Sequence, residues 1–155
     1  IEFIQRHRAT PFFAYLPTMT PHGPHDAPEE WVDFYRKRGI SEPLAKLWGM
    51  VSALDEQIGR VLAELDASGL GARTVVVFMS DNGPAIDLRV LDNGDRELRR
   101  VGGLRGWKGD LYEFGVRSPL FIRWCDQLKP RVVRDPVDLV DLAPTLLAMA
   151  GIGAV

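Results

Sequence analysis

Two oxygen-bearing side chains, Asp81 and Asn82, follow directly after Thr74–Met79, the most strand-like run of the sequence. Carboxylate and carboxamide oxygens are hard ligands that suit Ca²⁺ or Mg²⁺ better than zinc or copper. An Asp or Asn after a strand also commonly forms an Asx turn or caps the next helix. The tetrapeptide Ser80–Gly83 alone leaves both interpretations open. A second Asp-Asn-Gly, at residues 92–94, has no apolar run before it and is interpreted as a turn only.

Candidate basic and imidazole side chains lie in two loops. His22 and His25 occur in "TPHGPH", and a loop stiffened by prolines can hold a proton donor in place. Lys108 lies among glycines, where the backbone can approach a bound anion closely. Arg105 and Arg117 flank it in the same stretch. Each of these residues is also compatible with a solvated or structural role, so none decides the chemistry alone.

Other polar residues have simpler interpretations. Cys125, the single cysteine, is expected to be a small buried apolar residue. Asp138 and Asp141 are expected to serve the N-terminus of the last helix, and Glu113 to cap or to pair with a nearby arginine. One cysteine excludes an intrachain disulfide, argues against a cysteine-based zinc site, and is compatible with a periplasmic, secreted or cytoplasmic protein.

Composition restricts the class of protein and of partner. The 155 residues are 46% hydrophobic and 26% charged, which is ordinary for one globular domain or part of one. The formal net charge of -2 and the lack of a basic run argue against nucleic acid as a partner. No apolar run approaches the ~20 residues of a membrane span. Oligomeric state is not specified by the sequence.

The central elements predict an α/β fold. From Ser41, a plausible N-cap, apolar residues recur at spacings of three and four until Gly69 and Gly71 stop the helix. The stripe consists of Leu44, Leu47, Val51, Leu54, Ile58, Val61 and Leu65. Thr74–Met79 lacks polar alternation, which is typical of a strand covered on both faces in a parallel sheet. A helix followed by a buried strand indicates an α/β architecture.

The flanking segments give further predictions. The first residues are expected to be the end of a helix, with more sequence upstream of Ile1. Pro11–Pro17 is predicted to be a buried strand, followed by a stiff proline-rich loop through residue 28. The long connection Pro84–Gly115 is expected to be a functional or mobile loop. Arg117–Trp124 predicts another strand, and the chain is expected to close with a helix that has Pro144 in its first turn and ends at Gly151.

Several segments now line up in one order: "PFFAYL…PHGPH", "GMVSALDEQIGRVLAELDASGLGARTVVVFMSDNG", "GLRGWKGDLYEFGVRSP" and "VDLVDLAPTLLAMAG". Together they resemble the type I sulfatases of the alkaline-phosphatase-like superfamily, over Pro11 to Gly151. Each motif alone is weak, whereas the ordered set is specific. The resemblance implies an α/β/α sandwich of the alkaline-phosphatase-like type, of which residues 1–155 are an incomplete part of the catalytic domain.

The resemblance also implies roles for individual residues. The family's S-D-N-G supplies Asp and Asn ligands to a Ca²⁺ ion, so Asp81 and Asn82 take that role, with Mg²⁺ less favoured. The family's lysine that contacts the sulfate and the bridging oxygen matches Lys108. The family's P-H-x-P histidine, on the sulfate and leaving-group side, matches His22. His25 has no assured counterpart and is expected on the substrate side.

The sequence also departs from the family. It contains no C/S-x-P-S-R motif, the source of the family's formylglycine nucleophile, and lacks the family's N-terminal Asp pair and upstream Lys, His and Arg. We therefore expect these groups to precede Ile1, and expect this chain alone to bind Ca²⁺ weakly and to have no turnover. Arg117 matches a structural arginine, while Phe114 and Ser118 replace residues that are usually Gly and a small or β-branched residue.

These observations predict an arylsulfatase-like sulfuric ester hydrolase whose substrate is a small-molecule or glycan sulfate ester. Two alternatives stay open. The first is a phosphatase, phosphodiesterase or phosphonate ester hydrolase of the same superfamily; relatives of that kind often add histidine ligands for zinc, and neither His22 nor His25 lies beside a D-x-H pattern. The second is a non-catalytic homologue that binds sulfated glycans, although pure binding does not demand a cation ligand pair.

Overall fold

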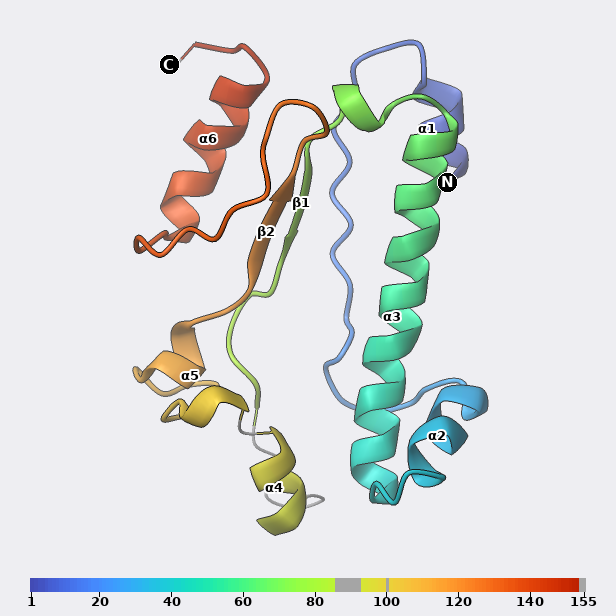
Figure 1. Cartoon of the computed structure of the whole chain (residues 1–155), viewed down its shortest axis with the longest axis vertical. Coiled ribbons are helices and arrows are strands. Elements are labelled where there is room, and N and C mark those ends of the chain that lie inside the picture. The colour runs from blue at the N-terminus through green and yellow to red at the C-terminus, as the bar shows by residue number, and fades with distance from the viewer. Residues whose placement is uncertain (86–92, 100, 154–155) are drawn as a thin grey trace.

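The computed structural model describes residues 1–85, 93–99 and 101–153, and places helices around a two-stranded sheet. In Figure 1, the long helix α3 lies on one side of the strands and the shorter α6 on the other. The elements are α1 (Glu2–His7), α2 (Glu29–Arg36), α3 (Glu42–Ala67), β1 (Val76–Met79), α4 (Asn93–Arg99), α5 (Glu113–Val116), β2 (Leu120–Arg123) and α6 (Leu142–Met149), with 3₁₀ turns at Gly71–Arg73, Val101–Gly103 and Leu139–Asp141. Helices around a sheet confirm the predicted α/β class. None of the described helices combines the length and apolar character needed to cross a bilayer.

The sheet brings both ends of a long connection together. β1 and β2 pair antiparallel, with Val76 opposite Arg123 and Met79 opposite Leu120. The carboxyl end of β1 therefore meets the start of β2, and residues 80–119 leave and return at the same edge. The prediction of a parallel sheet covered on both faces was wrong for this pair, because β1 has only β2 as a strand partner in the described residues and the Phe78 side chain is 39% exposed.

The helix α3 follows its sequence signals closely. The Ser41 hydroxyl accepts a hydrogen bond from the Leu44 N–H, which caps the helix as predicted. Near this end Leu44 and Leu47 are buried against α2, whose Val32 is also buried. At the other end Leu65 packs with α1, Phe12 and β1 in a second small cluster. The two ends of the predicted apolar stripe thus contact α2 on one side and α1 and β1 on the other, whereas Val51 in its middle is 45% exposed.

Polar contacts attach β2 to the carboxyl end of α3. The Arg123 guanidinium donates to both Asp66 carboxylate oxygens at 2.7 and 3.1 Å, and the Trp124 indole N–H donates to the Ala72 carbonyl at 3.1 Å. Cys125 is half-buried beside this contact, close to Gly71, in partial agreement with its predicted packing role. These contacts fix the sheet against α3. The position of the carboxyl end of β1 depends on this attachment.

The C-terminal helix agrees with its predicted boundaries. Asp138 and Asp141 form a capping box, in which the Asp141 carboxylate accepts from the Asp138 N–H at 2.9 Å and the Asp138 carboxylate accepts from the Val140 N–H at 3.3 Å. Pro144 lies in the first turn of α6, and the chain turns away at Gly151. The predicted pairing of Glu113 is also observed, since its carboxylate lies 3.7 Å from the Arg117 guanidinium.

Two local predictions were wrong, and a third was confirmed. Residues 11–17 are extended but pair with no strand in the described part of the chain, and Phe13, Tyr15 and Leu16 are exposed. The proline-rich segment has no helix or strand through residue 28, as predicted, and α2 follows it, because Pro28 occupies the N-cap position and Glu29 and Glu30 favour the first turn. Asn93 and Gly94 begin α4 and do not form an isolated turn, while Asp92 lies outside the described residues.

An exposed charge network joins α2 to the start of α3. The Arg36 Nε and Nη2 atoms donate to the two Glu42 carboxylate oxygens at 2.5 and 2.9 Å. Its Nη1 atom donates to Asp33 at 2.6 Å and also to Glu29. The hydrogen bonds from Arg36 are the main reason why the pKa of Glu42 falls from 4.5 to about 2. Arg36 is thus the common partner of three carboxylates.

We expect Arg36→Met to lower the urea midpoint of unfolding at pH 7. The folded-state pKa of Glu42 is depressed, so this stabilisation is present above pH 4.5 and is lost as the pH falls towards 2. The difference between variant and parent should therefore vanish near pH 2, and should shrink in 1 M salt, which screens exposed charges. Arg6→Met, which removes an isolated exposed pair with Glu2, is the control and should change little. A difference that persists unchanged at pH 2 would contradict the electrostatic origin.

Candidate active site

A tight turn at the carboxyl end of β1 carries Asp81 and Asn82. The Ser80 N–H donates to the Pro119 carbonyl at 3.2 Å, which extends the pairing with β2 by one contact. The Ser80 hydroxyl donates to the Asn82 carbonyl at 3.1 Å, and the Asn82 amide donates to the Asp81 carboxylate at 2.5 Å. The strand pairing and the serine contact hold the two oxygen-bearing side chains next to each other at the sheet edge.

Asp81 is held in its ionised form. The hydrogen bond from Asn82 is the largest cause of a lowered pKa for the Asp81 carboxyl, and partial desolvation opposes it. The backbone N–H of Asp81 and the positive charge of Lys108 lower this pKa further. This effect of the Lys108 charge is consistent with the hydrogen bond from the Lys108 N–H to the carbonyl of Pro84, three residues after Asp81.

Backbone hydrogen bonds hold the Lys108 loop against this turn. The Lys108 N–H donates to the Pro84 carbonyl, and the Gly83 N–H donates to the Gly115 carbonyl, both at 2.9 Å. Within the loop, the Phe114 N–H donates to the Arg105 carbonyl at 2.9 Å. Figure 1 shows the chain beyond β1 and the segment around α5 at the same end of the sheet. The position of Lys108 therefore follows from main-chain contacts on both sides of it.

This close backbone approach requires glycine at two positions. A Cβ atom at Gly83 would overlap the Phe114 carbonyl, and one at Gly115 would overlap the carbonyls of Trp107 and Asp110. Both glycines are buried. Sequence reasoning did not single out Gly83 and Gly115, although each lies within a quoted motif. A glycine next to a turn does not reveal which distant backbone it will contact.

The basic side chains beside Lys108 have structural partners. The Arg105 guanidinium stacks 3.7 Å from the centre of the Tyr112 ring, and Arg117 pairs with Glu113. Trp107 packs on Phe114 with ring centres 5.3 Å apart. Lys108 itself is exposed. The loop thus uses its arginines and aromatic rings for its own conformation and presents the Lys108 ammonium to solvent.

The histidines lie in the loop that leads to α2. The His22 ring is exposed, and its Nδ1 atom lies 2.8 Å from the Gly23 carbonyl oxygen, while its backbone N–H donates to Met19. His25 is half-buried. No hydrogen bond or ion pair in the described residues joins His22 to Asp81 or Lys108. The convergence of His22 with Lys108 stays a prediction.

The turn after β1 fits part of a cation site. The Asp81 carboxylate is ionised and exposed, and the Asn82 amide beside it carries a second hard oxygen. No group of three or more His, Cys, Asp or Glu side chains in the described residues could hold a metal ion. The turn therefore places two oxygen-bearing side chains next to each other, which is fewer than the six to eight oxygens that Ca²⁺ takes.

The sequence model of the Sulfatase family matches residues 1–152. The chain belongs to the sulfatase family. It is 36% identical over 151 residues to the steryl-sulfatase of Mus musculus, an alignment that covers 96% of this chain and 23% of the relative. It is 33% identical over 150 residues to the N-acetylgalactosamine-6-O-sulfatase of Bacteroides thetaiotaomicron, covering 95% of this chain and 28% of the relative.

A solved structure extends the comparison to the fold. The crystal structure of Ps i-CgsB in complex with k-i-k-neocarrahexaose superposes with a TM-score of 0.85 at 27% identity, covering 99% of this chain and 33% of that chain. The sulfatase chain described here therefore has part of the alkaline-phosphatase-like α/β fold, as predicted. It spans less than a third of the curated relatives named above.

We expect Gly83→Ala to destabilise the protein by about 1–3 kcal/mol, the range for overpacking a well-packed site. The added methyl group would push the turn away from Phe114 and break the Gly83–Gly115 hydrogen bond. Gly59→Ala is the control, since apart from its own helix backbone and chain neighbours no atom lies within 4 Å of its Cβ position in α3. It should stabilise by about 0.5–1 kcal/mol through helix propensity. Urea unfolding measures both, and equal effects of the two substitutions would contradict the close approach at Gly83.

Proposed function

We propose that the protein containing this chain hydrolyses sulfate esters with the help of Ca²⁺. The proposal is supported by membership of the sulfatase family and, above all, by the backbone hydrogen bonds that hold the Lys108 loop against the turn carrying Asp81 and Asn82. In this proposal Asp81 and Asn82 are two of the cation ligands. The nucleophile, a formylglycine, and the remaining ligands belong to a part of the protein that precedes these residues.

The charge distribution of the site suits this chemistry. Cleavage of a sulfate ester increases negative charge on the bridging oxygen and requires its sulfuryl oxygens to be held in place. An ammonium on a loop fixed by its backbone offers a donor placed in advance, which needs little reorganisation during the reaction. A divalent cation held by Asp81 and Asn82 supplies Lewis-acid stabilisation of the sulfuryl oxygens when it is bound. Lys108 then contacts the sulfate and the bridging oxygen.

His22 is proposed as the proton donor to the leaving oxygen, and His25 as a substrate-side residue. The support for His22 is its solvent-accessible ring, whose Nδ1 faces the Gly23 carbonyl, so that Nε2 is the nitrogen left for substrate. A neighbouring carbonyl oxygen favours a proton on Nδ1, and His22 therefore donates from Nε2 only when both ring nitrogens are protonated.

We expect Asp81→Ala in the full-length protein to weaken Ca²⁺ binding by at least about tenfold, because it removes the charged ligand of the pair. Isothermal titration with Ca²⁺ alone measures the affinity. Asp55→Ala, which removes an exposed carboxylate from α3, is the control and should leave the affinity unchanged. An unchanged affinity in Asp81→Ala would exclude Asp81 as a ligand, whether or not the protein hydrolyses sulfate esters.

We expect His22→Ala to lower kcat for an alkyl sulfate by about 10²–10⁴-fold, the range for loss of a general acid. The loss should be much smaller for a nitrophenyl sulfate, because a nitrophenolate leaves without needing a proton. His7→Ala, in α1, is the control. Equal losses for the two substrates would show that His22 does not protonate the leaving group. Faster turnover of phosphate than of sulfate esters by the parent protein would contradict the proposed function itself.

A further inference from the structure

One buried carboxylate takes no part in the proposed chemistry. Asp95, in α4, is 6% exposed and is the only buried polar or charged side chain in the described part of the chain. A buried carboxylate is costly unless hydrogen bonds or charges compensate it. Its contacts therefore indicate what holds α4 in place.

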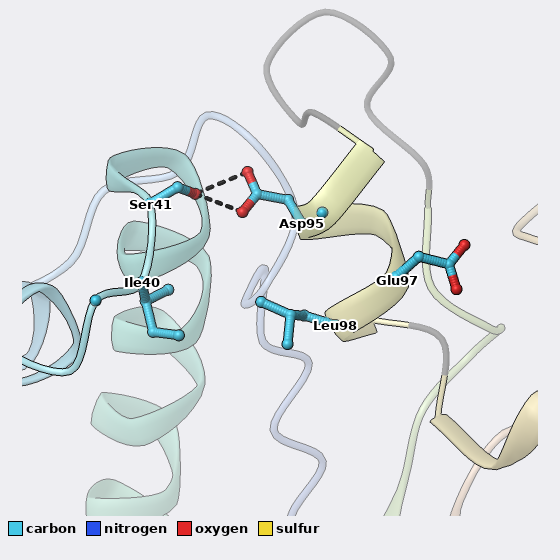
Figure 2. A pocket seen from close by; sticks show the side chains of 7 residues that line it. Ile40, Ser41, Asp95, Glu97 and Leu98 are labelled. Carbon is cyan, nitrogen blue, oxygen red and sulfur yellow. Dashed lines mark hydrogen bonds between the residues drawn. The ribbon is translucent and has the colours of Figure 1, made fainter.

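Asp95 is bound to the start of α3. The Ser41 hydroxyl lies 2.7 Å from each of the two Asp95 carboxylate oxygens and donates to them, as Figure 2 shows. The same hydroxyl accepts the capping hydrogen bond from Leu44, so Asp95 completes the cap of a 26-residue helix. A negative charge is favoured at a helix N-terminus. In Figure 2 the Ile40 and Leu98 side chains face each other beside this polar contact.

The opposite end of α4 is bound to the active-site backbone. The Arg99 guanidinium donates to the Ala85 carbonyl at 2.5 Å, and it lies 6.0 Å from the centre of the Trp107 ring. Ala85 directly follows Pro84, whose carbonyl accepts the hydrogen bond from the Lys108 N–H. Asp95 and Arg99 are four residues apart, so one helical turn separates the two attachments.

We propose that Asp95 is a positioning residue for Lys108. Through Ser41 it fixes α4 to α3. Through Arg99, α4 then contacts the Ala85 carbonyl and the Trp107 ring, which lie next to the Pro84 carbonyl and to Lys108, the two partners of the hydrogen bond that holds the loop. The expected effect of Asp95 on activity rests on the proposed function. The expected effect of Asp95 on the position of the Lys108 loop does not depend on that function. In this role Asp95 acts through Ser41, Arg99 and the backbone of the loop.

The test is a double-mutant cycle in the full-length protein with nitrophenyl sulfate. Asp95→Ala should lower kcat/KM by about tenfold or more, since small displacements of a catalytic group have large effects on rate. In a Lys108→Ala background the same substitution should change kcat/KM by less than about twofold, because the group that it positions is gone. Glu97→Ala is the matched control, since this exposed side chain of α4 points away from Ser41.

A second measurement is independent of catalysis. Asp95→Ala should speed hydrogen–deuterium exchange of the Lys108 amide, whose acceptor is Pro84, while Glu97→Ala should not. If Asp95→Ala fails to fold, Ser41→Ala takes its place, because it removes the same hydrogen bond from the side of α3. Ser41→Thr, which retains the hydroxyl, should preserve the slow exchange that Ser41→Ala loses.

The outcomes separate the two proposals. If the parent protein does not hydrolyse sulfate esters but exchange at Lys108 rises in the Asp95 variant, the proposed function fails and the positioning role stands. If the protein is active and Asp95→Ala lowers kcat/KM equally with and without Lys108, the loss is general destabilisation and the positioning role is wrong. Unchanged exchange at Lys108 would overturn it as well.

Discussion

The site depends on one backbone contact, the approach of the turn after β1 to the loop that carries Lys108. Gly83 and Gly115 share a hydrogen bond, and Lys108 is bound through its own N–H to Pro84. Antiparallel pairing of β1 with β2 makes this approach possible, because it returns residue 119 to the edge from which residue 80 leaves. Substituents are excluded at both glycines, so the spacing between the acidic turn and the backbone of Lys108 is set by the main chain.

The described core is small, which increases the importance of such polar contacts. One cluster centres on Ile4, Leu65 and Leu70 and the other on Leu44 and Leu47. Many large apolar side chains are exposed, among them Tyr15 at 77% and Phe121 at 64%. This exposure agrees with a chain that spans about a third of the solved relative whose fold it shares. Within this chain, hydrogen bonds from the sheet edge and from α4 position the site residues more directly than burial does.

The sequence predicted the elements that carry their own signals. The α3 helix was recognised because its cap, its apolar stripe and its terminal glycines agree with one another. β1 and β2 were found as apolar runs, but their direction was wrong, because a run of apolar residues reveals burial and not the partner strand. The strand predicted at residues 11–17 failed for the same reason, since strands need a partner and their composition does not provide one. The helix α2 had a usable signal in Pro28 followed by two acidic residues, which the density of prolines before it concealed.

The site residues also differ in whether a local sequence signal predicts their position. The neighbouring ligand pair Asp81 and Asn82 is a local feature, so its place after a strand could be predicted. The approach of Lys108 followed only from resemblance to a family, because a glycine-rich stretch does not specify which backbone it will contact. Asp95 could not be anticipated at all, since its partner Ser41 is 54 residues away and has a sufficient local explanation as a helix cap. A capping serine whose proton is still available can anchor a distant carboxylate. In the proposed positioning role, this dual use of Ser41 attaches α4 to α3 while the helix cap stays in place.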